Sequence, residues 1–282
     1  MKGFDRRLTA ARPDLAAAEL QGKVAASRFV PGRRMHVVAE VADLHSAPSH
    51  EAGVDTQALF GEEVTLYEDH EGWGWVQLAG DSYVGYLSMN ALAEGSYAAS
   101  HAVRVNRTFV YPAPNMKLPV LRALPLGARV AVAGGEAAFA SLCEGGFVFA
   151  GHLRPLARPE ADFVAVAEGL VGAPYLWGGK TGQGLDCSGL VQISLAQAGV
   201  AAPRDTDLQQ AGLGASLPTA DLAGLRRGDL VFWRGHVGIM QDAKRLLHAN
   251  AHHMLVASEP LDEACARIAR GGNGDIVAIK RL

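Results

Sequence analysis

Short runs of apolar and alternating residues follow one another through the first part of the chain. Turn residues separate the runs, as in Asp69–Gly72 and Ala79–Ser82. Short strands at such spacing are typical of a small β-barrel. The strands that we expect lie at 35–39, 63–67, 74–78 and 83–87. Before them, the stretch from Pro13 to about Ala26 predicts a short helix that contains Leu15, Ala18 and Glu19.

A weaker pattern of the same kind runs from about His101 to Pro155. Its turns are 134–136 and 144–146. This pattern predicts a second small barrel. A divergent copy of the first barrel is one interpretation, but the identity between the two segments is too low to prove a duplication. The strands that we expect here lie at 102–105, 129–133, 138–142 and 147–150.

The pattern changes after Arg154–Pro159, a proline-containing stretch that indicates a linker. Helices are expected at 161–170 and 187–198, with Gly199 as the C-terminal glycine cap of the second. Helices followed by strands favour an α+β domain. The strands expected here lie at 229–233, 236–240, 245–249 and 276–280.

Composition narrows the class of protein. The chain has 282 residues, of which 49% are hydrophobic, and its net charge is only -3. With no long basic run, nucleic acid and anionic membrane surfaces are poor candidates as partners. The N-terminus lacks the apolar core of a secretory signal, and no run reaches the ~20 apolar residues of a membrane span. We therefore expect a cytoplasmic protein.

Cysteine is scarce, and the residues Cys143, Cys187 and Cys265 form an odd set. Such a set argues against a disulfide framework and fits a reducing compartment. Cys143, in an expected β segment, and Cys265 lack a chemically suggestive setting, and we interpret both as structural. Cys187 is different, because it opens a predicted helix directly after Asp186.

Asp186 suits the N-cap of this helix, because a short carboxylate accepts backbone N–H bonds of the first turn. The positive end of the helix would then favour a thiolate at Cys187 near neutral pH, which makes this residue a candidate nucleophile. The alternative is that Cys187 is a small buried apolar residue. The glycine-containing segment 182–186 favours the nucleophile, because small residues let a substrate backbone approach.

Two histidines in expected strands can serve the thiol. His236 opens one strand, where alternation places it on the same face as Gly238 and Met240, and it is the candidate base. His248 on the next strand is the candidate third member, which would orient the base. Asn250 is a weaker candidate for that position. The neighbouring pair at 252–253 is expected in a loop.

One cysteine and two histidines also suit zinc, so a metal site is an alternative. The chain lacks CxxC, HxxH and HExxH spacings, which argues against zinc. We therefore expect no metal and no cofactor.

These residues resemble the NlpC/P60 cysteine peptidases, papain-like enzymes of bacterial cell-wall metabolism. The resemblance covers about 160–282. It implies a triad of Cys187, His236 and His248, with Tyr175 near the oxyanion position. The matching segments are Pro174–Gly179, Asp186–Val191, Arg227–Leu230, Gly235–Ile239 and His248–Ala249.

The N-terminal part resembles bacterial SH3 (SH3b) modules, and the second barrel matches them loosely. The matching segments of the first barrel are Val41–Leu44, Thr56–Glu62 and Tyr83–Leu87. The implied architecture is two small SH3-like β-barrels followed by an α+β papain-like NlpC/P60 domain. The expected boundaries are 1–30 for an N-terminal helical segment, 31–96 and 97–157 for the SH3b-like domains, and 158–282 for the peptidase domain.

This combination is similar to γ-D-glutamyl-L-diamino acid endopeptidases of the YkfC type, which act on recycled murein peptides with a free N-terminal L-alanine. A murein-derived peptide is therefore the expected partner. The resemblance implies substrate contacts by Asp186, Ser188, Asp205, Thr206 and Tyr83. An acidic residue of the first barrel is also expected at the free amine, and Glu51 and Asp55 are the candidates.

The resemblance implies acyl transfer from the γ-D-glutamyl carbonyl to Cys187, with His236 as base and His248 as its orienting partner. Two other functions remain open. One is an exported hydrolase that cuts intact murein. The other is a wall-binding protein in which the peptidase domain is secondary, although the complete set of Cys187, His236 and His248 argues against an inactive domain.

Overall fold

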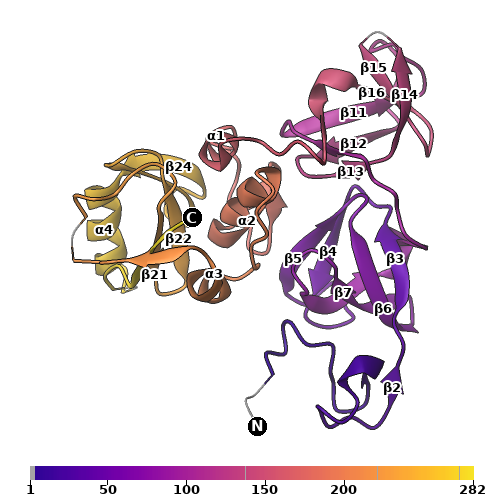
Figure 1. Ribbon diagram of the computed structural model, residues 1–282, viewed down its shortest axis with the longest axis horizontal. Coiled ribbons are helices and arrows are strands. Elements are labelled where there is room, and N and C mark those ends of the chain that lie inside the picture. Colours follow the sequence, from indigo (N-terminus) through magenta and orange to yellow (C-terminus); the bar gives the residue numbers. More distant parts are fainter. Residues whose placement is uncertain (1–3, 137, 221, 273) are drawn as a thin grey trace. The chain divides into compact units, whose positions relative to one another are not determined.

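The computed structural model describes residues 4–136, 138–220, 222–272 and 274–282. The chain divides into two compact units, Met1–Arg158 and Pro159–Leu282 (Figure 1). The division falls within the predicted linker at Arg154–Pro159. The first unit is built mainly from strands, and the second combines helices with an antiparallel sheet.

The N-terminal segment is not the helix that the sequence predicted over 13–26. It contains β1 (Ala16–Ala17), the single-turn 3-10 helix η1 (Ala18–Leu20) and β2 (Phe29–Val30), and β1 pairs with β2 in parallel. The alanines favour a helix by propensity, but tertiary packing decides here. Leu15 and the two alanines of β1 are buried, and Leu15 and Ala17 pack in a cluster that includes Trp75.

The first sheet of this unit runs in the order β5-β4-β8-β7-β6-β3-β9. Its inward side chains alternate with more exposed ones, and residues such as Leu44, Leu66, Val76 and Leu87 form the core. The expected strands at 35–39, 63–67, 74–78 and 83–87 each overlap an observed strand. The strands are β3 (Arg33–Val37), β4 (Val41–His45), β5 (Val54–Leu59), β6 (Glu63–His70), β7 (Trp73–Leu78), β8 (Val84–Ser88) and β9 (Leu92–Glu94), with the 3-10 turn η2 (Met89–Ala91) before β9.

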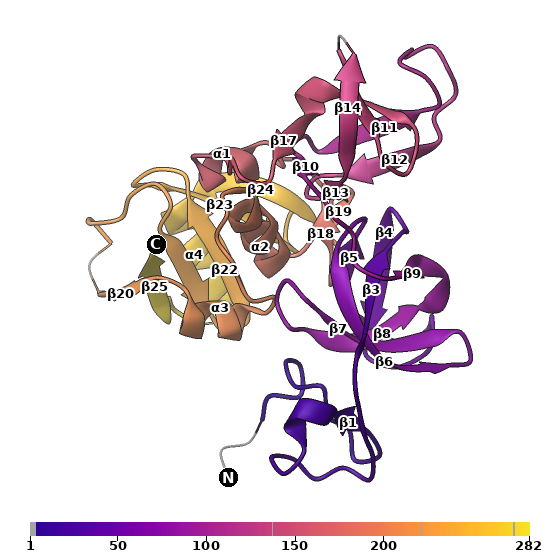
Figure 2. The ribbon, with the colours of Figure 1, turned by 45° about the vertical axis from the view of Figure 1, so that its right-hand side comes forward.

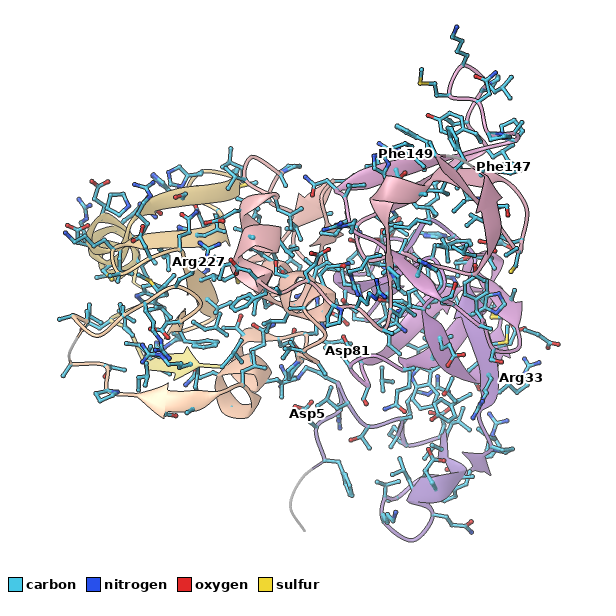
Figure 3. All side chains as sticks on the ribbon, turned by 45° about the horizontal axis from the view of Figure 1, so that its top comes forward. Asp5, Arg33, Asp81, Phe147, Phe149 and Arg227 are labelled. Atoms are coloured by element: carbon cyan, nitrogen blue, oxygen red, sulfur yellow. The ribbon has the colours of Figure 1, made fainter. Side chains whose placement is uncertain are left out.

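The rest of the unit forms two further sheets, in the orders β13-β10-β17 and β12-β11-β16-β15-β14 (Figure 2). Their core includes Val103, Leu124 and Val148. On β16, Phe147 and Phe149 flank the buried Val148 and are more exposed than it (Figure 3). The elements are β10 (His101–Val103), β11 (Arg107–Tyr111), β12 (Arg122–Pro125), β13 (Arg129–Val130), β14 (Val132–Glu136), β15 (Phe139–Leu142), β16 (Phe147–Phe149), η3 (Ala150–His152) and β17 (Leu153–Pro155).

The strand-rich character predicted for this unit is confirmed. The predicted barrels are not seen as closed, because the strand order of each sheet is open at both ends among the described residues. A second SH3-like module at 97–157 stays a prediction. Cys143 lies just after β15 and is exposed, so it is not inside a strand as expected.

The second unit is organised around an antiparallel sheet in the order β20-β25-β21-β22-β23-β24. Helix α2 packs against β22 and β23, and α4 packs against β23 and β24. The elements are α1 (Phe163–Glu168), β18 (Lys180–Thr181), β19 (Gly184–Leu185), α2 (Cys187–Gln197), α3 (Thr206–Gly212), β20 (Ala215–Leu217), β21 (Leu230–Trp233), β22 (His236–Met240), β23 (Arg245–Asn250), β24 (Leu255–Pro260), α4 (Leu261–Arg270) and β25 (Ala278–Arg281).

The main elements α1, α2, β21, β22, β23 and β25 match the sequence expectation. Gly199 adopts the left-handed conformation (φ 76°) of a C-terminal cap. Helices α3 and α4 and strands β18, β19, β20 and β24 were not predicted. Across the described residues, no helix is long and apolar enough to cross a membrane.

Candidate active site

Cys187 is the first residue of α2, and its position follows from the cap that precedes it. Asp186 has extended backbone angles and is the N-cap, with its Oδ1 accepting the N–H of Gly189 at 2.7 Å. A Cβ added at position 189 would collide with the carbonyl oxygen of Gly179. The glycine therefore lets the loop of Gly179 approach the helix and holds Cys187 at its start.

The carboxylate of Asp186 is held entirely by the protein around it. It accepts the N–H of Gly178 at 2.9 Å and a two-pronged contact from Arg204, at 2.9 Å to Oδ1 and 2.6 Å to Oδ2. Ser188 Oγ donates to Asp186 Oδ1 at 3.3 Å and accepts from Arg204 at 2.8 Å. The side chains of Asp186, Ser188 and Arg204 are all buried.

This network fixes the start of α2. Both carboxylate oxygens of Asp186 have donors, and so does the Ser188 hydroxyl. Burying a charge is costly unless it is paired and hydrogen-bonded, and here the charge of Asp186 is both. The substrate contacts expected of Asp186 and Ser188 stay a prediction.

The thiol of Cys187 is buried, with 8% of the residue exposed. Its sulfur lies 3.8 Å from Thr206 Oγ1 at the start of α3. The backbone N–H of Val237, in β22, is near enough to lower the pKa of the thiol. Among the described residues, Thr206 rather than the imidazole of His236 is the hydrogen-bond partner of the sulfur.

Burial, and then the charge of Asp186, raise the pKa of the Cys187 thiol. Thr206 and Val237 act in the opposite direction. Desolvation thus opposes the effect of the helix terminus on this pKa. A thiolate at Cys187 near neutral pH stays a prediction, and a base that accepts the thiol proton would favour it.

His236 and His248 are brought together as the sequence predicted for neighbouring strands. His236 Nε2 lies 2.8 Å from His248 Nδ1. The rings are 5.0 Å apart between centroids. Asn250, the weaker candidate, instead accepts the backbone N–H of His253 at 2.8 Å, so its carbonyl is engaged in the turn after β23.

The sequence did not reveal what holds His248. Its Nε2 lies 2.6 Å from Glu259 Oε1 on β24, and Arg267 of α4 donates to Glu259 Oε2 at 2.6 Å. Glu259 is buried, with 7% exposed. The only signal in the sequence is a charged residue within the otherwise uncharged stretch 255–260, and no motif marks it.

The protonation states follow from this arrangement. Burial, and then the neighbouring His248 and Arg267, lower the pKa of His236 to about 3. Burial also lowers the pKa of His248. Burial alone would raise the pKa of Glu259, but hydrogen bonds from His248 and Arg267 bring it to about 2. At neutral pH the two imidazoles are neutral and Glu259 is ionised.

Tyr175 lies in the loop before β18, and its backbone N–H donates to the carbonyl of Met254 at 2.9 Å. Burial, and then Cys187 and Asp186, raise the pKa of its phenol to about 12. The phenol is therefore protonated at neutral pH and able to donate a hydrogen bond beside the thiol. Asp205 is half-buried and precedes Thr206 at the start of α3.

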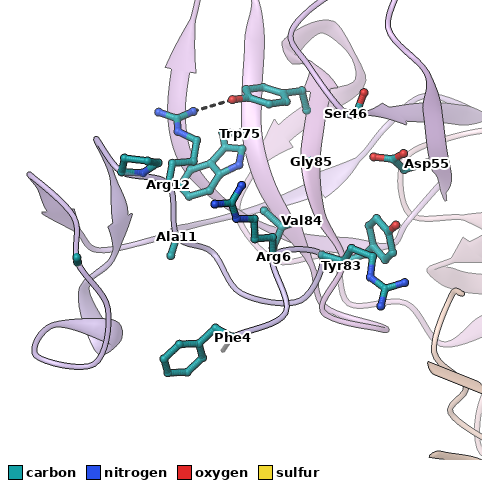
Figure 4. Close-up of a pocket in the computed structure, with 14 residues that line it drawn as sticks. Phe4, Arg6, Ala11, Arg12, Ser46, Asp55, Trp75, Tyr83, Val84 and Gly85 are labelled. Carbon is teal, nitrogen blue, oxygen red and sulfur yellow. Dashed lines mark hydrogen bonds between the residues drawn. The ribbon is translucent and has the colours of Figure 1, made fainter. Parts of the chain in front are cut away.

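Tyr83 belongs to the first unit, where it is buried against the core of the first sheet. It lines a pocket of about 450 Å³ together with Asp55 (Figure 4). Elsewhere in this pocket, Arg12 lies over the ring of Trp75, at 4.4 Å from its centroid. Glu51 is exposed. The substrate contact expected of Tyr83 stays a prediction.

In the part of the chain that the structure describes, no group of His, Cys, Asp and Glu side chains is arranged to hold a metal ion. Cys187 begins α2, which packs against the strands that carry the two coupled imidazoles, and Glu259 adds a carboxylate behind them.

Two family models match the chain. Residues 172–267 match the NlpC/P60 family, and residues 44–92 match the bacterial dipeptidyl-peptidase Sh3 domain. The chain carries an NlpC/P60 domain. In this domain, Cys187, His236, His248 and Glu259 all lie within the matched residues.

Relatives of known name share much of the chain. A γ-D-glutamyl-L-lysine dipeptidyl-peptidase of Bacillus cereus is 27% identical over 207 residues, which cover 64% of this chain and 60% of the relative. The protein of the same name from Bacillus subtilis is 27% identical over 220 residues, covering 70% of this chain and 72% of the relative. The chain thus spans about three fifths of the first relative's length.

A solved structure has the same fold. The crystal structure of an NlpC/P60 family protein from Bacillus cereus matches with a TM-score of 0.73, covering 88% of this chain and 99% of that one, at 19% identity. At this identity the likeness concerns the fold alone.

Proposed function

We propose that this protein is a cysteine peptidase that cleaves the γ-D-glutamyl-diamino acid bond of murein peptides with a free N-terminal L-alanine. One observation carries the chemistry. Cys187 begins α2, which packs against β22 and β23, and on these two strands His236 is hydrogen-bonded to His248 at 2.8 Å. A thiol, a base and a residue that orients the base form the set that acyl transfer by cysteine requires.

In the proposed reaction the sulfur of Cys187 attacks the γ-carbonyl carbon of D-glutamate, and the thiol proton moves to His236 Nδ1. Since His236 Nε2 contacts His248, Nδ1 is the nitrogen left for this transfer. The imidazole must approach the sulfur when substrate binds, which is usual because catalytic hydrogen bonds often tighten only in the complex.

The negative charge on the carbonyl oxygen needs donors. The backbone N–H of Cys187 lies in the first turn of α2, where N–H groups lack helical partners. With the protonated phenol of Tyr175, it would form the oxyanion hole. His236 then gives its proton to the departing amine as the C–N bond breaks. Water attacks the thioester, its proton passes through His236, and L-Ala-D-Glu leaves.

The substrate assignment rests on the names of the relatives and on the residues near the thiol. Two relatives are named γ-D-glutamyl-L-lysine dipeptidyl-peptidase. Asp205 lies next to Thr206, which contacts the thiol, and is the acidic group that we propose for the free α-amine. We further propose that the substrate is a soluble peptide from murein recycling in the cytoplasm, and that residues 97–157 form a second SH3-like module.

The test is product analysis by mass spectrometry with L-Ala-γ-D-Glu-L-Lys and the corresponding diaminopimelate peptide. We expect L-Ala-D-Glu and the free diamino acid, and no turnover by Cys187→Ala. Intact peptides after incubation with the wild-type protein would contradict the proposal.

A second arm tests the substrate class. The N-acetylated peptide and intact murein sacculi are offered beside the free peptide. We expect cleavage of the free peptide alone, because an acetyl group removes the charge that an acidic subsite requires. Equal cleavage of the acetylated peptide would contradict recognition of the amine, and release of peptides from sacculi would favour a hydrolase of intact murein.

A further inference from the structure

In the hydrogen bond between His236 and His248, either ring could be the donor, and neither ring alone decides which one donates. A neutral imidazole carries a proton on one nitrogen and a lone pair on the other. The contact between His236 Nε2 and His248 Nδ1, at 2.8 Å, can form with the proton on either side. Only one of these arrangements leaves the lone pair of His236 Nδ1 available to accept a thiol proton.

Glu259 is placed where it decides between the two arrangements. In the register of β23 with β24, His248 faces Ala257, so Glu259 lies two residues along the same face of the neighbouring strand. A diagonal position of this kind is within reach of a long side chain. Glu259 Oε1 lies 2.6 Å from His248 Nε2.

The carboxylate can only accept in this contact, because Arg267 holds it in the ionised form. Arg267 donates to both of its oxygens, and the contact to Oε2 is 2.6 Å. Guanidinium groups have no acceptor and remain charged. His248 must therefore donate from Nε2, and its Nδ1 is left with a lone pair.

We propose that Glu259 is a positioning residue of the reaction: it fixes the proton of His248 on Nε2, so that His236 donates from Nε2 and keeps Nδ1 free for the thiol proton. This inference rests on the proposed function for its consequence in turnover. Its geometric content, the tautomer of the two histidines, does not depend on the substrate.

The same contacts also suggest a purely structural role, since Arg267 lies on α4 and Glu259 on β24. The two roles differ in what they change. A tether between helix and sheet affects stability, whereas a positioning carboxylate affects the imidazole tautomers and the reactivity of Cys187.

The first experiment observes the tautomers in the full-length wild-type protein by ¹⁵N NMR of labelled histidine at neutral pH. We expect a protonated Nε2 and an unprotonated Nδ1 in both His236 and His248, with assignment by His236→Asn and His253→Asn. An unprotonated Nε2 in His248 would overturn the proposal, and this result needs no variant of Glu259.

The second experiment compares Glu259→Gln with Glu168→Gln. Glu168 is a matched control because it too accepts from an arginine, Arg227 at 2.8 Å, but lies outside the histidine chain. We expect Glu259→Gln to lower kcat by about 10- to 100-fold at a similar KM, the range found when a carboxylate behind a metal-binding histidine is lost. Glu168→Gln should retain wild-type kcat.

Alkylation of Cys187 by iodoacetamide supplies a readout that needs no peptide substrate. Peptide-resolved mass spectrometry follows Cys187, with the exposed Cys143 as internal reference. We expect slower alkylation of Cys187 in Glu259→Gln and an unchanged rate at Cys143. If the proposed function fails, no peptide is cut, yet the tautomers and alkylation still report on Glu259. Rates and tautomers equal to those of Glu168→Gln would overturn the proposal.

Discussion

His236 Nε2 and His248 Nδ1 lie 2.8 Å apart, where His236 opens β22 and His248 stands near the end of β23. In the proposed reaction, this hydrogen bond makes His248 the group that orients the base. Because His248 is itself held by Glu259 at 2.6 Å, the ring of His236 has a fixed partner on one side. In the proposed reaction, the nitrogen on its other side, Nδ1, accepts the proton of Cys187.

His248→Ala should therefore retain the fold and lose most activity. Without its partner, His236 rotates and populates both tautomers, and we expect kcat to fall by about 100-fold, within the range that general acid–base groups contribute. His253→Ala is the control, since His253 hydrogen bonds to Asn250 in the turn after β23 and stands outside the chain from His236 to Glu259. Steady-state kinetics on the free peptide measure kcat for both variants. An equal kcat in His248→Ala and His253→Ala would contradict the role of His248 in orienting His236.

Thr206 tests how the thiol is held. Its hydroxyl lies 3.8 Å from the sulfur of Cys187 and lowers the pKa of the thiol, against the effect of burial. Thr206→Val keeps the shape and removes the hydroxyl, so we expect alkylation of Cys187 to slow by about 2- to 10-fold, as for the loss of one hydrogen bond. Thr206→Ser keeps the hydroxyl and should react like the wild type. A valine variant that alkylates as fast as the serine variant would show that this contact does not matter.

The start of α2 was predictable because its signals are local. Asp186 next to Cys187 identifies a cap within the helix's own first turn, and the structure forms that cap at 2.7 Å to Gly189. The roles of Arg204 and Glu259 were not found, because they depend on contacts across 18 and 11 residues of sequence. Neither stands in a motif that indicates its partner.

In the N-terminal segment, the local signals themselves led to a wrong prediction, a helix over 13–26. Alanine favours a helix around Ala16 and Ala17 by local propensity. The structure instead pairs these residues with Phe29 and Val30, because this arrangement satisfies the backbone and buries both alanines. Helix propensity reflects only the local sequence, whereas here the pairing of β1 with β2 determines the conformation.

The buried pair of Arg204 and Asp186 predicts a large difference between two arginine substitutions. Arg204→Met leaves the carboxylate of Asp186 buried without its partner, and we expect the free energy of unfolding to fall by about 3–5 kcal/mol. Arg227 is more exposed (Figure 3), and Arg227→Met removes its ion pairs with Asp162 and Glu168. We expect a loss of about 1 kcal/mol or less there, because solvent screens such pairs.

Urea unfolding of both variants, with hydrogen exchange of α2 amides to identify the second unit, measures this difference. Similar losses in the two variants would contradict the inference that the Arg204–Asp186 pair anchors the start of α2. The comparison is informative because both residues are arginines that contact carboxylates in the same unit.

Acid should destabilise the second unit through His236. Its pKa in the folded protein is about 3, mainly because of burial, against an ordinary value of 6.5. Between these values the unfolded chain binds a proton that the folded chain does not, so stability falls as the pH drops below about 6.5. Between pH 7 and pH 5 this effect amounts to at most about 2 kcal/mol for one histidine. His236→Asn removes it and keeps an amide that can donate to His248.

We therefore expect the wild-type protein to lose more unfolding free energy between pH 7 and pH 5 than His236→Asn. Hydrogen exchange of amides in β22 and β23, corrected for the intrinsic effect of pH, measures the loss in the unit that contains the histidine. His248 also has a lowered pKa and remains in both proteins, so its contribution cancels in the comparison if the substitution leaves its surroundings unchanged. An equal loss in the two proteins would mean that His236 is not held neutral by the fold.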